Sequence, residues 1–278
     1  TDTKVIDSIP TTQINGSINL TDSATANVKG LVNLNGNVTL INHSQFTLSN
    51  NATQIGDIQL SNLTNATVNN ATLTGNVNLT DSSRFTLSNQ ATQIGTISLH
   101  QQAQATVDNA NLNGNVNLTD SAQFSLKNSH FSHQIQGDKD TTVTLENATW
   151  TMPSDTTLQN LTLNNSTVTL NSAYSASSNN APRHRRSLET ETTPTSAEHR
   201  FNTLTVNGKL RGKGTFQFTS SLFGYKSDKL KLSNDAEGDY TLSVRNTGKE
   251  PETLEQLTLI ESLDNKPLSD KLKFTLEN

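Results

Sequence analysis

The sequence predicts an all-β fold, a parallel β-helix in which each coil of about 19–20 residues contributes three short strands. Three observations favour this fold. A pentad led by glycine repeats at a nearly fixed period. Apolar residues alternate with polar ones inside each repeat. Asn or Gly recurs 14 residues after each pentad glycine. Each observation accounts for one part of the coil.

The pentad marks the start of each coil. It recurs as GSINL, GNVTL, GDIQL, GNVNL, GTISL and GNVNL, led by Gly16, Gly36, Gly56, Gly75, Gly95 and Gly114. Successive glycines are therefore 20, 20, 19, 20 and 19 residues apart. A fixed period of this length is typical of a solenoid, in which a coil buries its apolar face only against its neighbours.

Apolar residues within a coil alternate with period two, which indicates strands and argues against leucine-rich or all-helical repeats. Val77 and Leu79 lie in the first strand, and Phe85 and Leu87 in the second. Because stacked coils lie roughly 4.8 Å apart, a phenyl ring packs best above a small residue. We therefore expect two buried stacks. One is Ala26, Phe46, Ala66, Phe85, Ala105 and Phe124, and the other is Leu48, Val68, Leu87, Val107 and Leu126.

A tight corner is predicted after the second strand. Asn and Gly tolerate the left-handed region, so a position restricted to them suggests a positive φ. Stacked side-chain amides could also bond from coil to coil there. The corner residues are Gly30, Asn50, Asn70, Asn89, Asn109 and Asn128, followed by Asn147 and Asn165.

The sequence divides into three parts: regular coils over 1–171, a polar flexible loop over 172–200 and a C-terminal cap over 201–278. Between Gly114 and Gly137 the third side is predicted to lengthen, with His130, Phe131, His133 and Ile135 in an extra turn. Trp150 and Met152 are interpreted as local core filling. The terminal part has longer coils, as expected of a region that closes the open end of a solenoid.

Composition excludes several classes of protein. Hydrophobic residues make up 31% of the chain and charged residues 16%, the net charge is −5, and there is no cysteine. A disulfide scaffold and a thiolate metal site are therefore excluded, and nothing suggests a nucleic-acid partner. The sequence has no apolar run long enough for a membrane-spanning helix and suggests no cofactor or metal site. The first residues look like an earlier coil, so we expect the chain to be cut from a longer polypeptide.

Short strings in 206–248, namely NG, G-x-G-x-F, SD-x-L-x-L, G-x-x-x-L-x-V and N-x-G, resemble the pertactin-type C-terminal passenger region of classical autotransporters. The whole chain, including RHRRSLETETTPTSAEHRFNTLTVNGKL, resembles the C-terminal passenger part of the Hap-type self-associating serine-protease autotransporter adhesins. The resemblance implies a right-handed β-helix, exported through the periplasm and outer membrane and displayed on a bacterial surface. It also implies that 201–278 helps the passenger to fold, as an autochaperone region does.

As partners, the resemblance implies a second copy in trans between cells, which would produce aggregates and microcolonies or biofilm, and also fibronectin, laminin and collagen IV. It implies a trypsin-like protease domain upstream, but the chain itself has no GDSG-type nucleophile string and no Ser/His/Asp set. Two alternatives stay open. One is a passive stalk that presents the protease, and the other, less favoured, is a β-helical polysaccharide-degrading enzyme.

Outward positions of the strands are the candidate self-association surface, since they form ladders of short hydrogen-bonding side chains. We expect two copies to meet in antiparallel fashion along such a ladder, chiefly by polar contacts. On the second strand these candidates are Thr47, Ser49, Thr67, Asn69, Thr86, Ser88, Thr106 and Asp108. On the first strand they are Asn76, Asn78, Asn115 and Asn117.

Overall fold

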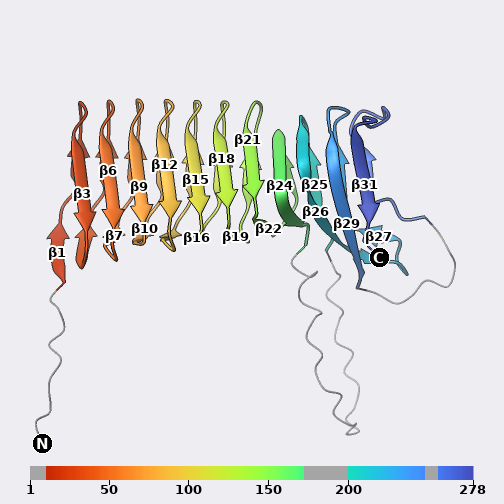
Figure 1. Ribbon diagram of the computed structural model, residues 1–278, viewed down its shortest axis with the longest axis horizontal. Coiled ribbons are helices and arrows are strands. Elements are labelled where there is room, and N and C mark those ends of the chain that lie inside the picture. Colours follow the sequence, from red (N-terminus) through yellow and green to blue (C-terminus); the bar gives the residue numbers. More distant parts are fainter. Residues whose placement is uncertain (1–10, 172–199, 248–255, 278) are drawn as a thin grey trace, which may run out of the picture.

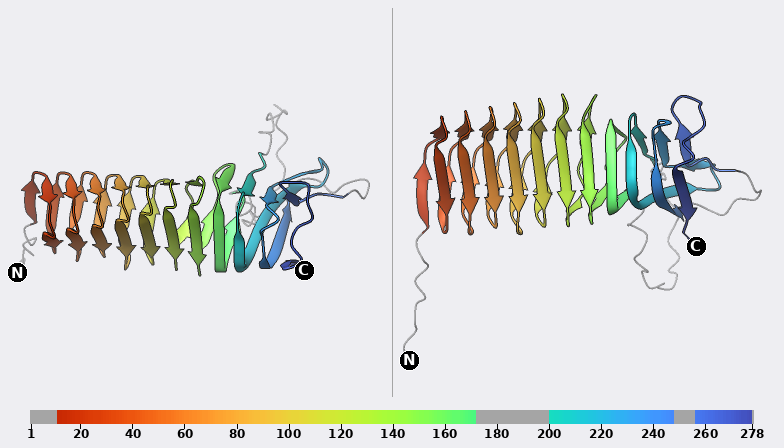
Figure 2. Two further views of the ribbon diagram at one scale, coloured as in Figure 1. Left: turned by 90° about the horizontal axis from the view of Figure 1, so that it is seen from above. Right: turned by 45° about the horizontal axis from the view of Figure 1, so that its top comes forward.

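The computed structural model describes residues 11–171, 200–247 and 256–277, and the predicted loop over 172–200 lies almost wholly outside them. Its strands stack into one elongated solenoid, with the coils following one another in sequence order along the long axis (Figures 1 and 2). Within these ranges the secondary structure is entirely β, so no helix there could cross a membrane. The predicted parallel β-helix is confirmed.

Each regular coil has three sides. The first side consists of β2 (Ile18–Leu20), β5 (Val38–Leu40), β8 (Ile58–Leu60), β11 (Val77–Leu79), β14 (Ile97–Leu99), β17 (Val116–Leu118) and β20 (Ile135–Gly137). The second side consists of β3 (Thr25–Lys29), β6 (Gln45–Ser49), β9 (Asn65–Asn69), β12 (Arg84–Ser88), β15 (Gln104–Asp108), β18 (Gln123–Lys127), β21 (Thr142–Glu146) and β24 (Asn160–Thr169). The third side consists of β1 (Thr12–Asn15), β4 (Val32–Asn35), β7 (Thr53–Ile55), β10 (Thr72–Thr74), β13 (Thr92–Ile94) and β16 (Asn111–Asn113).

Later coils extend the same plan. β19 (His130–Phe131) and β22 (Thr149–Thr151) continue the third side but join the sheet of β24, and β26 (Leu210–Ser221), β29 (Gly238–Asn246) and β31 (Leu272–Leu276) prolong the second side. β23 (Thr156–Leu158), β25 (Thr203–Val206), β28 (Lys229–Leu232) and β30 (Ile260–Ser262) form a separate four-stranded sheet. Strand pairs are parallel except that β26 pairs antiparallel with β27 (Lys226–Ser227).

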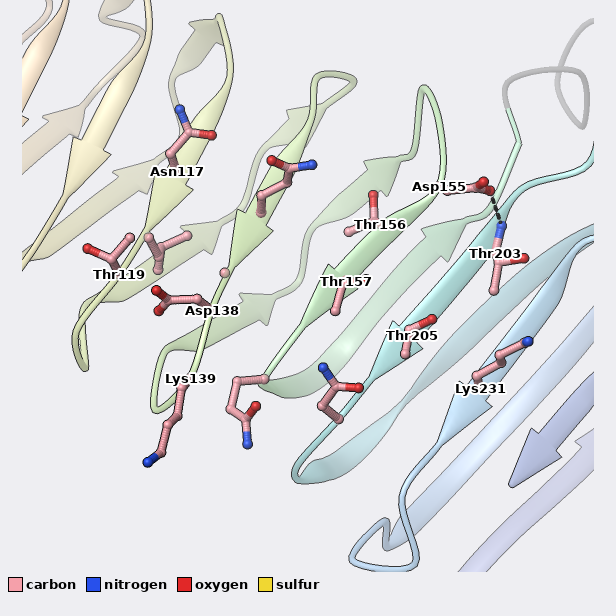
Figure 3. Close-up of a pocket in the computed structure, with 15 residues that line it drawn as sticks. Asn117, Thr119, Asp138, Lys139, Asp155, Thr156, Thr157, Thr203, Thr205 and Lys231 are labelled. Atoms are coloured by element: carbon pink, nitrogen blue, oxygen red, sulfur yellow. Dashed lines mark hydrogen bonds between the residues drawn. The ribbon is translucent and has the colours of Figure 1, made fainter. Parts of the chain in front are cut away.

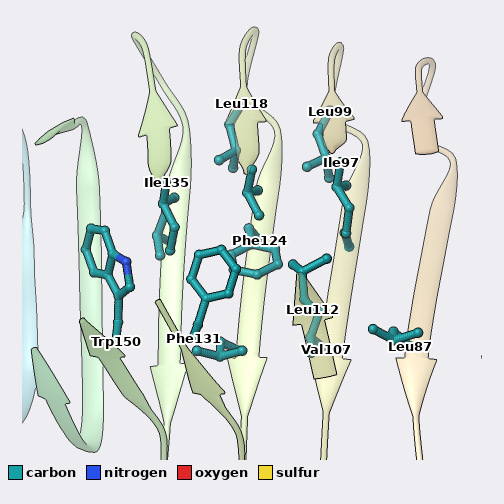
Figure 4. Close-up of a cluster of buried hydrophobic side chains, with 14 of the residues drawn as sticks. Leu87, Ile97, Leu99, Val107, Leu112, Leu118, Phe124, Phe131, Ile135 and Trp150 are labelled. Carbon is teal, nitrogen blue, oxygen red and sulfur yellow. The ribbon is translucent and has the colours of Figure 1, made fainter. Parts of the chain in front are cut away.

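Phe and Ala alternate along the core as predicted. Phe85 pairs in register with Ala66 on one side and Ala105 on the other, and its side chain is 1% exposed. The Leu/Val stack is likewise buried. Figure 4 shows how Leu, Val, Ile and Phe side chains from successive coils fill the interior as far as Trp150. Both predicted stacks are confirmed, except that Ala26, near the first described residues, is only half-buried.

The pentad glycines are required by close contact between coils. A Cβ added to Gly75 would lie 2.0 Å from the carbonyl oxygen of Gly56, and one on Gly114 would lie 2.0 Å from that of Gly95. No real Cβ approaches an oxygen so closely, so the backbones can stack here only without side chains. The pentad signal in the sequence therefore records a steric requirement.

The predicted extra turn after Gly114 is wrong. Ile135 pairs with Val116, and Gly137 pairs with Leu118, so Gly137 is an inward strand residue and not the start of a coil. His133 occupies the place of the pentad glycine, 19 residues after Gly114. Phe131 is buried and contacts Phe124, with ring centroids 6.3 Å apart. The coil keeps its ordinary length, and substitution of the marker glycine hid this from the sequence.

Candidate functional site

The second side presents the ladder that the sequence proposed as an interface. Thr47, Thr67, Thr86 and Thr106 stand in register on neighbouring strands. They are half-buried because each faces outward from a strand that has neighbours on both sides. Ser49, Asn69, Ser88 and Asp108 form a parallel row two residues further along the strands. This side is therefore a flat array of short polar side chains.

Charges interrupt the second side. Arg84 lies on the same strand as Thr86 and donates a hydrogen bond to the amide oxygen of Gln104, 3.3 Å away. Lys127 pairs with Glu146 at 3.0 Å, and both side chains are exposed enough to be hydrated. Such surface pairs contribute about 0–1 kcal/mol to stability. Their greater effect is on recognition, because a partner must match each charge.

On the first side, Asn78 and Asn117 face outward from strands in the same sheet. Asn76 and Asn115 instead hold coils together. The Asn76 Oδ1 accepts the backbone N–H of Thr96 at 2.9 Å, and the Asn115 Oδ1 accepts that of Gln134 at 3.2 Å. These two exposed candidates therefore already use a side-chain oxygen in a bond between neighbouring coils, which the sequence did not reveal.

The corner asparagines have the left-handed conformation. Asn50, Asn70, Asn89, Asn109, Asn128, Asn147 and Asn165 have φ between 45° and 55°, and their side chains are exposed. The amide ladder expected along them is wrong. In the described chain the side chains of these seven asparagines make one hydrogen bond, from Asn128 to Asp108 at 2.8 Å. The stack is held by backbone bonds such as Asn70 N–H to the Ser88 carbonyl, 3.1 Å.

An amide ladder exists at the other corner, between the first and second sides. The Asn62 amide donates to the Asn42 Oδ1, and the Asn42 amide donates to Asp22, both at 3.1 Å. Each of these residues also has a positive φ. Residues at this corner follow each pentad in the sequence, but their types vary from coil to coil, so the ladder could not be recognised from the sequence.

A recess of about 940 Å³ opens where the first side meets the sheet of β23 and β25 (Figure 3). Its lining combines hydroxyls and amides with the charged groups of Asp138, Lys139, Asp155 and Lys231. The Asp155 Oδ1 accepts the backbone N–H of Thr203 at 2.8 Å. These residues are far apart in sequence, which explains why sequence reasoning did not bring them together.

The recess lies at a seam between two sheets. β20 and β23 are not paired as strands. The first residue of β20, Ile135, and the first residue of β23, Thr156, are 21 residues apart, whereas the preceding coil is 19 residues long. The side chain of Gln134 bridges the gap. Its amide donates to the Thr156 hydroxyl at 2.6 Å and to the Asp155 carbonyl at 3.1 Å, while its oxygen accepts the Ser154 hydroxyl at 2.9 Å. The longer coil thus interrupts the sheet and leaves a polar hollow.

Asp228, the acidic residue of the SD-x-L-x-L string, is 0% exposed. Its carboxylate accepts the backbone N–H of Asn202 at 2.7 Å and both the N–H and the hydroxyl of Thr219 at 2.6 Å. The Asn171 amide adds a fourth bond at 3.3 Å. Asp228 therefore links three parts of the chain: Asn171 before the segment 172–199, Asn202 after it, and Thr219 in β26. Its role is structural.

The histidines of the described ranges do not assemble a metal site. Within the described ranges no three His, Cys, Asp or Glu side chains are placed to hold an ion. The His133 carbonyl accepts the indole N–H of Trp150 at 3.1 Å, and the Nδ1 of His100 lies 2.6 Å from the Thr119 hydroxyl. Trp150 and Met152 are fully buried, in agreement with core filling.

Two family profiles match the chain. The profile described as Pertactin matches residues 158–278, and that described as PIC/HAP1/IgA0 second beta-solenoid repeat region matches residues 89–145. The two matches lie on either side of the seam between β20 and β23. No catalytic domain is evident in the part of the chain that the structure describes.

Known proteins resemble the chain closely. The adhesion and penetration protein autotransporter of Haemophilus influenzae strain Rd is 79% identical over all 278 residues, which span 17% of that relative. A second Haemophilus influenzae protein of the same name is 93% identical over 150 residues, or 54% of this chain and 11% of that one. The crystal structure of the Haemophilus influenzae Hap adhesin superposes with a TM-score of 0.84 and 57% identity, covering 96% of this chain and 31% of that one.

The chain thus spans less than a fifth of the two relatives it matches in sequence. Its β-solenoid, its two profile matches and its identity to these proteins all lead to the same assignment. Over its full length the chain is homologous to part of the Hap-type adhesion and penetration autotransporters, as a β-solenoid segment of an adhesin passenger.

Proposed function

We propose that the chain is an adhesive module displayed on a bacterial surface, where it binds a second copy of itself and so links cells into aggregates, microcolonies and biofilm. The observation that carries the proposal is a rigid solenoid with flat ladders of short polar side chains, in a homologue of proteins named for adhesion and penetration. Export through the periplasm and outer membrane belongs to the same proposal.

Repetition makes weak contacts sufficient. One hydrogen bond contributes only about 0.5–1.5 kcal/mol net. Because the ladder residues are held in register by the strands, a partner that fits one coil fits the next with no further ordering cost. The first-side and second-side candidates named from the sequence are two places where such contacts could form.

Matrix proteins are a second proposed class of partner. Fibronectin, laminin and collagen IV follow from the resemblance alone, and they would bind the same solenoid. Residues 201–278 are proposed to cap it and to promote its folding. A solid-phase binding assay with each matrix protein tests the partners separately from self-association.

Two alternatives make different predictions. A passive stalk would present an upstream protease and would neither aggregate nor bind matrix proteins. The second alternative is a polysaccharide-degrading enzyme. Its candidate site would be the recess, because Asp138 and Asp155 both line it. Reducing ends released from soluble polysaccharides, and lost in Asp138→Asn, would favour the enzyme.

Analytical ultracentrifugation of the purified chain tests the main proposal. We expect the weight-average mass to rise with concentration and beads coated with the chain to aggregate. Substituting Thr67, Thr86 and Thr106 by Lys, with the core unchanged, tests the second side. If circular dichroism is unchanged and aggregation is undiminished, that side is not the interface. A chain that stays monomeric and leaves the beads dispersed would favour the stalk.

A further inference from the structure

Asn-Gly steps are places where a polypeptide can modify itself. Glycine has no side chain to keep its backbone nitrogen away from the carboxamide of the asparagine before it. Once that nitrogen loses its proton, it can attack the asparagine Cγ. A bond from the nitrogen to Cγ forms, the bond from Cγ to Nδ2 breaks, and ammonia leaves. Water then opens the resulting cyclic imide to aspartate or isoaspartate. The chain has four such steps, at Asn15-Gly16, Asn35-Gly36, Asn113-Gly114 and Asn207-Gly208.

All four asparagine side chains are exposed, so access to solvent does not distinguish them. The hydrogen bond of the glycine N–H does, because a nitrogen that donates to a fixed carbonyl is neither free to lose its proton nor free to turn toward Cγ. Three of the four glycines are bonded in this way. Their bonds are Gly16 N–H to the Asn35 carbonyl at 3.0 Å, Gly36 N–H to the Ile55 carbonyl at 2.9 Å and Gly208 N–H to the Gln159 carbonyl at 2.8 Å.

Gly114 lies where the regular stacking of the third side stops. The six-stranded sheet of this side ends at β16, since β19 pairs with β22 and not with β16 in the described chain. At this break the Ala110 N–H donates to the Ser129 hydroxyl at 3.2 Å in place of a backbone carbonyl. For the Gly114 N–H, the described residues provide no hydrogen-bond acceptor. This glycine nitrogen is therefore the free one of the four.

The asparagine side chains differ in the same direction. The Asn35 amide donates to the Asn15 Oδ1 at 2.9 Å, so each of these two side chains is held by the other. The Asn113 carboxamide makes no hydrogen bond to the residues that the structure describes. Both reacting groups are thus free at Asn113-Gly114, whereas both are held at Asn35-Gly36.

We infer that Asn113 is a modification site of the folded chain, converted to aspartate or isoaspartate through the backbone nitrogen of Gly114. The reaction consumes only water and needs no enzyme, so it goes beyond the proposed adhesive function and does not depend on it. Its product places a carboxylate on the third side, where the segments 89–94 and 109–113 contain no Asp, Glu, Lys or Arg. Isoaspartate also adds one carbon to the main chain between β16 and β17.

The hydrogen bonds set the expected difference in rate. At Asn35 the bond from Gly36 must break before the nitrogen can attack, whereas at Asn113 no such bond has to break. One net hydrogen bond of about 1.4 kcal/mol corresponds to about a tenfold change in population. We therefore expect Asn113 to react about tenfold faster than Asn35 in the folded chain. In the unfolded chain these bonds are absent, so the four steps are expected to react at similar rates.

Peptide mapping by mass spectrometry tests the site. The purified chain is incubated in mildly alkaline buffer, with and without urea, and the exchange of an amide nitrogen for oxygen is followed at each of the four steps. Hydroxylamine, which cleaves the cyclic imide, is expected to cut the folded chain between Asn113 and Gly114. Asn113→Gln is the matched control, because its longer side chain keeps the amide but forms an imide far more slowly.

The inference stands if Asn113 reacts about tenfold faster than Asn35 and Asn207 without urea, and if this preference disappears in urea. Comparison with Asn207 is the sharpest, because Gly208 N–H is bonded although Asn207 is exposed. Equal rates at Asn113 and Asn207 in the folded chain would overturn the inference. So would reaction of Asn113 only in urea, or hydroxylamine cleavage that persists in Asn113→Gln at the same place.

Discussion

Replacing Asp228 by Ala is expected to destabilise the C-terminal coils more than any surface substitution. The buried carboxylate accepts two backbone N–H groups, those of Asn202 and Thr219. The Thr219 hydroxyl can rotate, and the Asn171 amide keeps its bond to the Arg200 carbonyl at 2.6 Å. Two buried N–H groups would thus lose their acceptor, at about 1–3 kcal/mol each, which predicts a loss of about 2–6 kcal/mol.

Asp228→Asn gives an intermediate case. The amide keeps the shape and one acceptor oxygen, but its NH₂ group meets a backbone N–H where the second carboxylate oxygen stood. One donor is left unsatisfied, so the expected cost is about 1–3 kcal/mol. Asp239→Ala, at an exposed position of β29, is the matched control and is expected to stay within about 0.5 kcal/mol of the parent chain.

Urea unfolding followed by circular dichroism measures the global loss. Hydrogen exchange at the amides of Asn202 and Thr219 measures the local loss, because these two protons bond directly to the carboxylate. The expected order of stability is Asp239→Ala, then Asp228→Asn, then Asp228→Ala. Equal stability of Asp228→Ala and Asp239→Ala, with both amides still protected, would refute the assignment of Asp228 as a structural link.

Three further predictions concern the regular coils. Phe85→Ala removes a ring that is 1% exposed and is expected to cost about 3–5 kcal/mol, measured as faster amide exchange in the coils on either side. Because φ is 54° at Asn89, Asn89→Gly is expected to leave the free energy of unfolding nearly unchanged and Asn89→Val to lower it by about 1–2 kcal/mol. Equal melting temperatures of the two variants would contradict this prediction. Deleting the 39 residues Gly56–Ile94 keeps each Phe stacked on an Ala. Deleting the 19 residues Gly56–Thr74 instead stacks Phe46 on Phe85, and this overpacking is expected to destabilise the fold by about 1–3 kcal/mol. Cooperative unfolding of the longer deletion and not of the shorter is the expected result.

Most of the fold could be predicted because each coil repeats its own constraints. The pentad glycine is fixed by contact with the coil before it, and the corner asparagine by a positive φ. These constraints act on single residue types, so they remain visible in the sequence. Where His133 replaces the glycine, the same coil continues, but its marker is lost and the prediction failed there.

The recess and the Asp228 link could not be predicted for a different reason. Both depend on residues from coils that are far apart in sequence, such as Asp155 with Thr203 and Asp228 with Asn202. No local pattern encodes which coil will be longer or which carboxylate will be buried. The second-side candidates, with Asn78 and Asn117 on the first side, do lie at outward strand positions, whereas Asn76 and Asn115 lie just before β11 and β17. The structure was needed to show that Arg84 bonds to Gln104 beside the second-side candidates and that Asn76 bridges two coils.

The core and the third side share one period, because both follow the alternation of the coils. Inside, Phe85 must lie above a small residue, so coils alternate in pairs. Outside, Ile55 and Ile94 recur at the same interval with Thr74 between them. Because the core sets the spacing between coils, it also sets the spacing of the exposed isoleucines. The surface pattern on this side is therefore a consequence of how the rings pack inside.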